Sequence, residues 1–195
     1  MALTDRTVTG LLDAFSSADP TPGGGSAAAL SGAIAASLLS MVASMPKSKT
    51  NAVAEREALD EANTEIVKLR TALIDLIDRD ADAYDLVVAA FRKPKASDED
   101  KAARKAAIQD ATRVATEVPL ETMSACAGLL ALARTVEAHG NSNAASDVHV
   151  AIELARAGLK GARYNVDINL GGITDATIAA SLRAAADKWL MASGH

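Results

Sequence analysis

The residues of this chain that could carry out chemistry are two aspartates and a few hydroxyl and amide side chains set among apolar or small residues. The aspartates are Asp80 and Asp147. Two carboxylates together with amides suit general acid–base catalysis on a neutral or cationic nitrogen heterocycle. The polar side chains grouped with them are Ser26, Asn141, Asn143, Asn165 and Asn169.

Asp80 interrupts an apolar stripe on a predicted long helix. Burying a carboxylate is costly unless the group is paired or used. A structural Asp80 should be paired with a cation or a helix terminus, whereas a catalytic Asp80 should face a ligand. The nearby Asp78, Asp82 and Asp85 fall on other helix faces, and we interpret them as solvated charges. The stripe repeats in steps of three and four residues: Leu59, Ala62, Ile66, Leu69, Leu73, Leu76, Asp80, Ala83, Val87 and Ala90.

Asp147 is the second candidate acid. It begins a stripe of small residues that continues through Ala151, Leu154, Gly158 and Gly161. Residues 140–147 are dense in polar side chains, so Asn141, Asn143 and Ser146 could cap helices or bind a ligand. For Asp147 the structural and the catalytic interpretation both remain open.

A proline- and glycine-rich segment, residues 20–30, precedes a run of almost uninterrupted small and apolar residues. We predict that a helix begins there near Gly25 or Ser26. Its free N–H groups and positive dipole end would suit a carboxylate, phosphate or carbonyl oxygen. We therefore expect Gly23, Gly24, Gly25 and Ser26 to contact a ligand; the alternative is a linker before a core helix.

Several other chemistries are disfavoured. His139, His149 and His195 lack metal-ligand spacing with a cysteine or with each other, so no metal site is predicted. Cys126 lies in Ala-Cys-Ala-Gly without an activating base nearby in sequence and is interpreted as a small core residue. No nucleotide-binding fingerprint is present, because the three glycines follow a proline loop and not a strand.

The elements that must position these residues are all predicted to be helices. We expect an all-α bundle of about six helices, two or three of them very long, forming one domain over residues 1–195. The fourth should be kinked at Pro119, and residues 165–169 should be extended or irregular helix. The predicted helices span 4–16, 25–45, 51–92, 98–138, 147–164 and 175–191.

Composition supports this fold class and narrows the function. Hydrophobic residues make up 49% of the 195 positions but aromatic residues only 3%, which favours an alanine-rich helical core. The net charge of −5 argues against nucleic-acid binding. A single cysteine excludes an internal disulfide, and no signal peptide is apparent, so we expect a cytoplasmic protein. The apolar run 26–45 is rich in Ser, Gly and Ala, which favours a buried helix over a membrane span.

Five segments in a fixed order resemble the formiminotransferase-cyclodeaminase C-terminal family, particularly its stand-alone bacterial methenyltetrahydrofolate cyclohydrolases. They are PTPGGGSAAALSGAIAASLLSMV from 20, DADAYDLVVAAFRKPK from 80, ATEVPLE from 115, GNSNAASD from 140 and NVDINL from 165. The resemblance covers roughly residues 5–185. It implies an all-helical homodimer that binds tetrahydrofolate, as a cofactor-substrate, in a cleft without a metal.

The family pattern usually carries a glycine, a lysine run and a tyrosine after the small-residue helix. Lys49 matches the first lysine and is expected to bind substrate, but the tyrosine is absent. His149 stands where a small residue is common. These departures support the alternative of a folate-binding protein that has lost catalysis.

The resemblance implies hydrolysis of 5,10-methenyltetrahydrofolate to 10-formyltetrahydrofolate. The near alternative is formiminotetrahydrofolate cyclodeaminase activity, in which N10 attacks the formimino carbon and ammonia leaves. Both reactions need a carboxylate near a delocalised cation and a group that moves protons. Asp80 and Asp147 are the expected catalytic residues. Asn141, Asn143, Ser146 and Asn165 are expected to bind the substrate.

Overall fold

The computed structural model describes residues 2–45 and 52–192, and each regular element within these ranges is helical. The expected all-α fold with six helices, several of them long, is therefore confirmed. The elements are η1 (Leu3–Asp5), α1 (Val8–Phe15), α2 (Gly24–Ser44), α3 (Val53–Phe91), α4 (Asp98–His139), η2 (Ser142–Ala144), α5 (Ala145–Leu170) and α6 (Ala176–Ala192).

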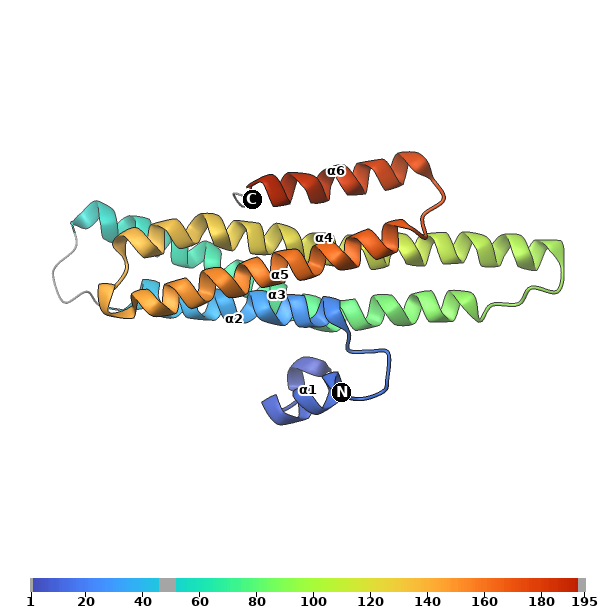
Figure 1. The fold of residues 1–195 in the computed structure, drawn as a ribbon, viewed down its shortest axis with the longest axis horizontal. Helices are drawn as coiled ribbons and strands as arrows, with labels where there is room; N and C mark the ends of the chain where they lie inside the picture. Colours follow the sequence, from blue (N-terminus) through green and yellow to red (C-terminus); the bar gives the residue numbers. More distant parts are fainter. Residues whose placement is uncertain (1, 46–51, 193–195) are drawn as a thin grey trace.

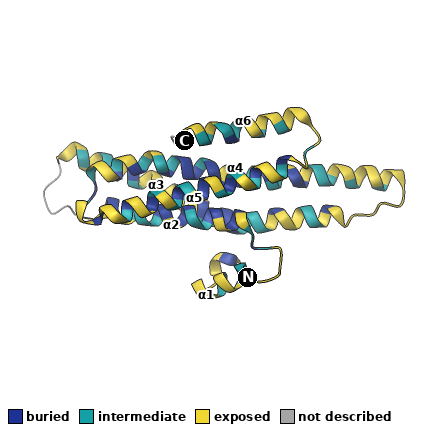
Figure 2. Cartoon of the chain, viewed as in Figure 1, coloured by how far each residue is buried: buried dark blue, intermediate teal, exposed yellow. Residues whose placement is uncertain are grey.

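Four of these helices form the bundle. α2 packs against α3 and α5, and α4 packs against the same two helices from the other side. α6 lies outside the bundle against α4 and α5 (Figure 1). η1 contacts α3. Figure 2 shows the buried residues concentrated where the four long helices run side by side. The far ends of α3 and α4 continue as a hairpin beyond the start of α2 (Figure 1).

Small residues let these helices approach closely. Gly158 of α5 faces α2, and a Cβ at this position would lie 2.8 Å from the carbonyl oxygen of Ala28. The buried thiol of Cys126 fills the neighbouring space between Gly32 and Gly158. Cys126 is thus a core residue, as expected, and burial raises the pKa of its thiol to about 12.

α2 is the helix whose composition raised the question of a membrane span. By length and composition it could cross a membrane, with a mean hydropathy of 1.7 over its most apolar window, and 56% of that window is buried inside the protein. Its buried apolar residues belong to the core that it forms with α3 and α5.

The predicted helix boundaries are mostly confirmed. Ser97 caps α4 in a capping box with Asp100, and the Asp175 carboxylate accepts hydrogen bonds from the backbone N–H groups of Thr177 and Ile178 at the start of α6. α4 continues through Pro119 as one helix.

Two predicted segments were wrong. The expected helix over 4–16 is divided into η1 and α1, because Thr7 is extended and its side chain caps α1 by accepting from Gly10. Residues 165–169 are the last turns of α5. Their alternating pattern misled because Ile168, although apolar, is 77% exposed while Val166 is buried.

Candidate active site

A cavity of about 290 Å³ lies where α2 begins and α3, α4 and α5 continue. It brings together residues from three segments that are distant in the sequence. They are Gly23, Gly24 and Gly25 at the start of α2, Asp80 on α3, and Asn165 and Asn169 on α5. Three features that stood out in the sequence therefore meet at one place: the glycine-rich turn, Asp80, and the segment that carries Asn165 and Asn169.

Asp80 and Ser26 join α3 to the first turn of α2. Asp80 Oδ2 accepts a hydrogen bond from the backbone N–H of Ser26 at 2.7 Å and another from its hydroxyl at 3.0 Å. This N–H is one of the four at a helix start that have no partner within the helix. The carboxylate thus caps α2 from outside and lies at the positive end of its dipole.

Gly25 makes this approach possible. A Cβ at Gly25 would lie 1.9 Å from Asp80 Oδ1, so only glycine fits at that position. Gly24 is different, because a Cβ there would have only an ordinary contact, 3.6 Å from Asn165 Nδ2. The glycines expected to contact a ligand therefore include one whose role is to admit the Asp80 carboxylate.

The environment of Asp80 pulls its pKa in two directions. Burial disfavours the charged carboxylate and raises its pKa, while the two hydrogen bonds from Ser26 partly oppose this, leaving the pKa above the usual aspartate value. Both hydrogen bonds from Ser26 end on Oδ2, so within the described residues Oδ1 is the oxygen left to meet a ligand. The structural and the catalytic interpretation of Asp80 are thus compatible: one oxygen caps α2 and the other remains available.

The two asparagines present acceptors to the cavity. Asn165 Nδ2 donates to the carbonyl oxygen of Gly161 at 2.9 Å, and Asn169 Nδ2 donates to that of Ala115 at 2.6 Å. With each amide nitrogen engaged by protein, each Oδ1 can still accept. Together with Asp80, these oxygens favour a ligand that is cationic or carries N–H groups.

The second predicted group, Asp147 with Asn141, Asn143 and Ser146, lies elsewhere in the chain. Asp147 is in the first turn of α5, and 18 residues of helix place it about 27 Å from Asn165. The nearby Asn141 caps η2, its side chain accepting from the N–H of Asn143 at 3.0 Å; Asn143 and Ser146 are exposed. Within the chain this group does not reach the Asp80 cavity, and Lys49 lies outside the described residues.

The environment of Asp78 differs from the one inferred from the sequence. It is not simply solvated, because its carboxylate accepts hydrogen bonds from the Leu3 N–H and the Thr4 hydroxyl and so attaches η1 to α3. Asp82 and Asp85 are exposed, as expected. Sequence periodicity could not reveal a partner more than 70 residues away.

Several cavity residues were not predicted. Thr21, Tyr84 and Ala115 line the same space. Tyr84 follows Asp80 by one helical turn, so helical spacing alone could have identified it. Thr21 and Ala115 carried no comparable signal.

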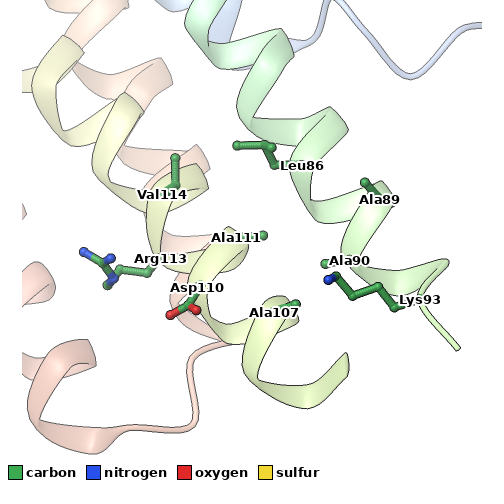
Figure 3. A pocket seen from close by; sticks show the side chains of 9 residues that line it. All are labelled: Leu86, Ala89, Ala90, Lys93, Ala107, Asp110, Ala111, Arg113 and Val114. Atoms are coloured by element: carbon green, nitrogen blue, oxygen red, sulfur yellow. The ribbon is translucent and has the colours of Figure 1, made fainter. Parts of the chain in front are cut away.

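A larger pocket between the far ends of α3 and α4, about 370 Å³, lacks converging polar groups. In Figure 3, Asp110 and Arg113 point away from α3, and the wall is formed mostly by alanine and aliphatic side chains such as Leu86 and Val114. Within the described residues, no group of three or more His, Cys, Asp or Glu side chains could hold a metal ion.

Comparison with known proteins shows the family of the chain. Residues 7–188 match the model of the formiminotransferase-cyclodeaminase family. The methenyltetrahydrofolate cyclohydrolase of Methylorubrum extorquens is 41% identical over 90% of this chain and 84% of its own length. The formimidoyltransferase-cyclodeaminase of Sus scrofa is 34% identical over 83% of this chain, which spans only 30% of that protein.

A solved structure has the same fold. The formiminotetrahydrofolate cyclodeaminase of Thermotoga maritima superposes with a TM-score of 0.86 and 25% identity, covering 97% of this chain and 90% of that one. The chain therefore belongs to the formiminotransferase-cyclodeaminase family.

Proposed function

We propose that this protein is a methenyltetrahydrofolate cyclohydrolase, which converts 5,10-methenyltetrahydrofolate and water to 10-formyltetrahydrofolate at the Asp80 cavity. The observation that carries the proposal is the position of the Asp80 carboxylate. Ser26 donates two hydrogen bonds to Oδ2, and Oδ1 is left to meet a ligand in the cavity that Asn165 and Asn169 also line. The likeness to the Methylorubrum cyclohydrolase over most of both chains supports the choice of reaction.

The substrate carries a positive charge delocalised over N5, N10 and the carbon that bridges them. Acceptor oxygens from Asp80, Asn165 and Asn169 would stabilise this cation and the N–H groups of the pterin ring. The cavity volume of about 290 Å³ suits the ring and the bridging carbon, so the remainder of the folate would extend beyond it.

In the proposed reaction, Asp80 removes a proton from water as the water oxygen forms a bond to the bridging carbon. The neutral tetrahedral adduct then opens: the C–N5 bond breaks, and Asp80 returns the proton to N5. The hydroxyl of the adduct loses its proton to solvent and becomes the formyl carbonyl. A raised pKa suits Asp80 to both accepting and donating the proton.

Two alternatives remain, and one pair of assays separates them. Loss of the methenyltetrahydrofolate absorbance would follow hydrolysis, and ammonia release from formiminotetrahydrofolate would follow cyclodeamination. The proposal expects faster turnover of the methenyl substrate. Faster turnover of the formimino substrate would instead make the protein a cyclodeaminase, and binding without turnover of either would make it a non-catalytic folate-binding protein.

We also propose a homodimer that forms through α2. This helix has no charged residue, yet Ile34 and Met41, one heptad apart, are 44% and 40% exposed. Beside it runs an apolar groove of about 350 Å³ that includes Leu11, Leu38 and Ile74. Arg6 and Arg70 also line this groove, and Arg70 donates to the Ser37 hydroxyl of α2. Exposed apolar side chains on a helix without charged residues of its own are typical of a surface covered by a partner. Light scattering at micromolar concentration should give the dimer mass, and Ile34→Glu should give the monomer mass.

An antiparallel dimer on this face would bring the two polar groups together. The Asp80 cavity lies at the start of α2, whereas Gly140, just before the Asp147 group, packs near Val42 at its end. We propose that Asp147, Asn141, Asn143 and Ser146 of one subunit meet the Asp80 cavity of the other. Mixed Asp80→Asn and Asp147→Asn subunits would then form heterodimers with one intact site, recovering about a quarter of wild-type turnover. No recovery after subunit exchange would contradict this arrangement.

Location and metal use complete the proposal. The reduced, buried Cys126 suits the cytoplasm. The described residues offer no cluster of metal ligands, so we propose a metal-independent reaction. Turnover should survive dialysis against a chelator, and loss of turnover that added metal restores would contradict this proposal.

A further inference from the structure

Pro119 lies inside α4, four residues after Ala115, which lines the cavity. Proline has no backbone N–H, so the carbonyl oxygen of Ala115, four residues earlier, lacks its usual helical partner. The proline ring also crowds that carbonyl. Ala115 is partly buried and lines the cavity, so its free carbonyl oxygen can accept a hydrogen bond from a neighbouring helix.

Asn169 of α5 supplies that donor. Its Nδ2 lies 2.6 Å from the Ala115 oxygen in a partly buried contact, and both residues line the cavity. A carbonyl can only accept, so the amide must turn its NH₂ group to Ala115. Its Oδ1 is thereby left as the acceptor available to a ligand.

We propose that Pro119 is a positioning residue for the active site. Because Pro119 has no backbone N–H, the Ala115 carbonyl can accept from Asn169 without competition. This hydrogen bond fixes the orientation of the Asn169 amide. This inference rests on the proposed function, because Asn169 is taken to receive the folate. It gives a role to the ATEVPLE and NVDINL segments, whose Ala115 and Asn169 are joined by a hydrogen bond although 54 residues separate them.

A purely structural proline would behave differently. If Pro119 served only to shape α4, its replacement would alter stability without any specific dependence on Asn169. If Pro119 instead keeps the Ala115 carbonyl free for Asn169, then Pro119→Ala restores an N–H that competes with Asn169. The resulting loss in kcat/KM should then be absent in a protein that already lacks the Asn169 amide.

The test compares wild type with Pro119→Ala, Asn169→Ala and the double variant, measuring melting temperature and kcat/KM on methenyltetrahydrofolate. We expect each single variant to lose about tenfold or more in kcat/KM, since small misplacements at a site are costly. The double variant should fall no further than Asn169→Ala, within about threefold. Melting temperature should stay level or rise in Pro119→Ala, because a helix-interior proline is replaced by the best helix former.

Thr122→Ala is the matched control. It changes a buried side chain of the same helix, whose hydroxyl contacts the Val118 carbonyl, and leaves Ala115 untouched. It should keep wild-type kcat/KM. Pro119→Ser serves as a second variant that restores the same N–H.

Wild-type kcat/KM in Pro119→Ala, or independent losses that multiply in the double variant, would overturn the proposal. So would failure of both proline variants to fold, because the proposal gives Pro119 no role in folding. A crystal structure of Pro119→Ala provides a readout that does not depend on the reaction. It should show the restored backbone N–H of the substituted residue donating to the Ala115 carbonyl, and a displaced Asn169 amide, even if the wild type hydrolyses no folate and the proposed function fails.

Discussion

Gly25→Ala should disable the site without dismantling the fold. The new Cβ would lie 1.9 Å from Asp80 Oδ1, whereas such contacts essentially never fall under 3.0 Å, so the carboxylate must retreat by more than about 1.1 Å. Ser26 N lies 2.7 Å from Oδ2, so the same movement would carry this pair beyond hydrogen-bonding range. A misplacement of about 1 Å can cost about 10²-fold in rate, and we expect kcat to fall by about that factor.

The effect on stability should be small. Losing a hydrogen bond to a charged group costs about 1.5–3 kcal/mol, and replacing glycine by alanine in a helix returns about 0.8 kcal/mol. The net loss of about 1–2 kcal/mol corresponds to a decrease in Tm of about 2–8 °C for a chain of this size. Steady-state kinetics on methenyltetrahydrofolate and a thermal melt measure both quantities.

Gly24→Ala is the matched control, one residue earlier in the same turn. Its Cβ would have only the ordinary contact with Asn165 and would leave Asp80 in place, so kcat should fall far less than in Gly25→Ala. Near-normal turnover in Gly25→Ala would refute the reasoning, because the carboxylate would then have moved without consequence. Equal losses in both variants would refute it as well, since the effect would belong to the turn and not to Asp80.

Two further predictions concern the same carboxylate. Ser26→Ala removes the 3.0 Å hydroxyl bond but keeps the backbone N–H bond, so kcat/KM should fall by about tenfold while Asp80 stays in place; wild-type kinetics would show that the hydroxyl has no role. Because burial raises the pKa of Asp80, the acid limb of the pH–kcat/KM profile should lie above the usual aspartate value; a limb at or below that value would contradict the assignment. Charged Asp80 correspondingly costs stability above its raised pKa, and the fold should regain that stability as the pH falls through it.

The sequence was sufficient to predict the helical bundle and to single out Asp80. Asp80 stood out because every other member of its stripe is apolar, and the structure places it against the first turn of α2. The sequence could not show which of the three consecutive glycines must lack a side chain, because this depends on Asp80, 55 residues from Gly25. The Asp78 contact with Leu3 was missed for the same reason.

The distance between Asp80 and Asp147 could not be predicted from the sequence either. Both acids begin or interrupt an apolar stripe, and a stripe records the face of a helix but not its position along the bundle. Only the packing of α5 against α2 shows that the two groups lie at opposite ends. The contribution of Asn169 depends on Pro119 in another helix, which local patterns cannot link.

The most direct test of the central claim, that Asp80 moves the proton in folate hydrolysis, is the turnover of Asp80→Asn. The amide oxygen that this substitution introduces can still accept from Ser26, so the fold should persist with a Tm within a few degrees of wild type. General acid–base groups contribute about 10²–10⁴-fold, so the loss of methenyltetrahydrofolate absorbance should slow by at least about 10²-fold. Asp85→Asn, an exposed neighbour on the same helix, should match wild type. Near-normal turnover in a stable Asp80→Asn protein would contradict the account.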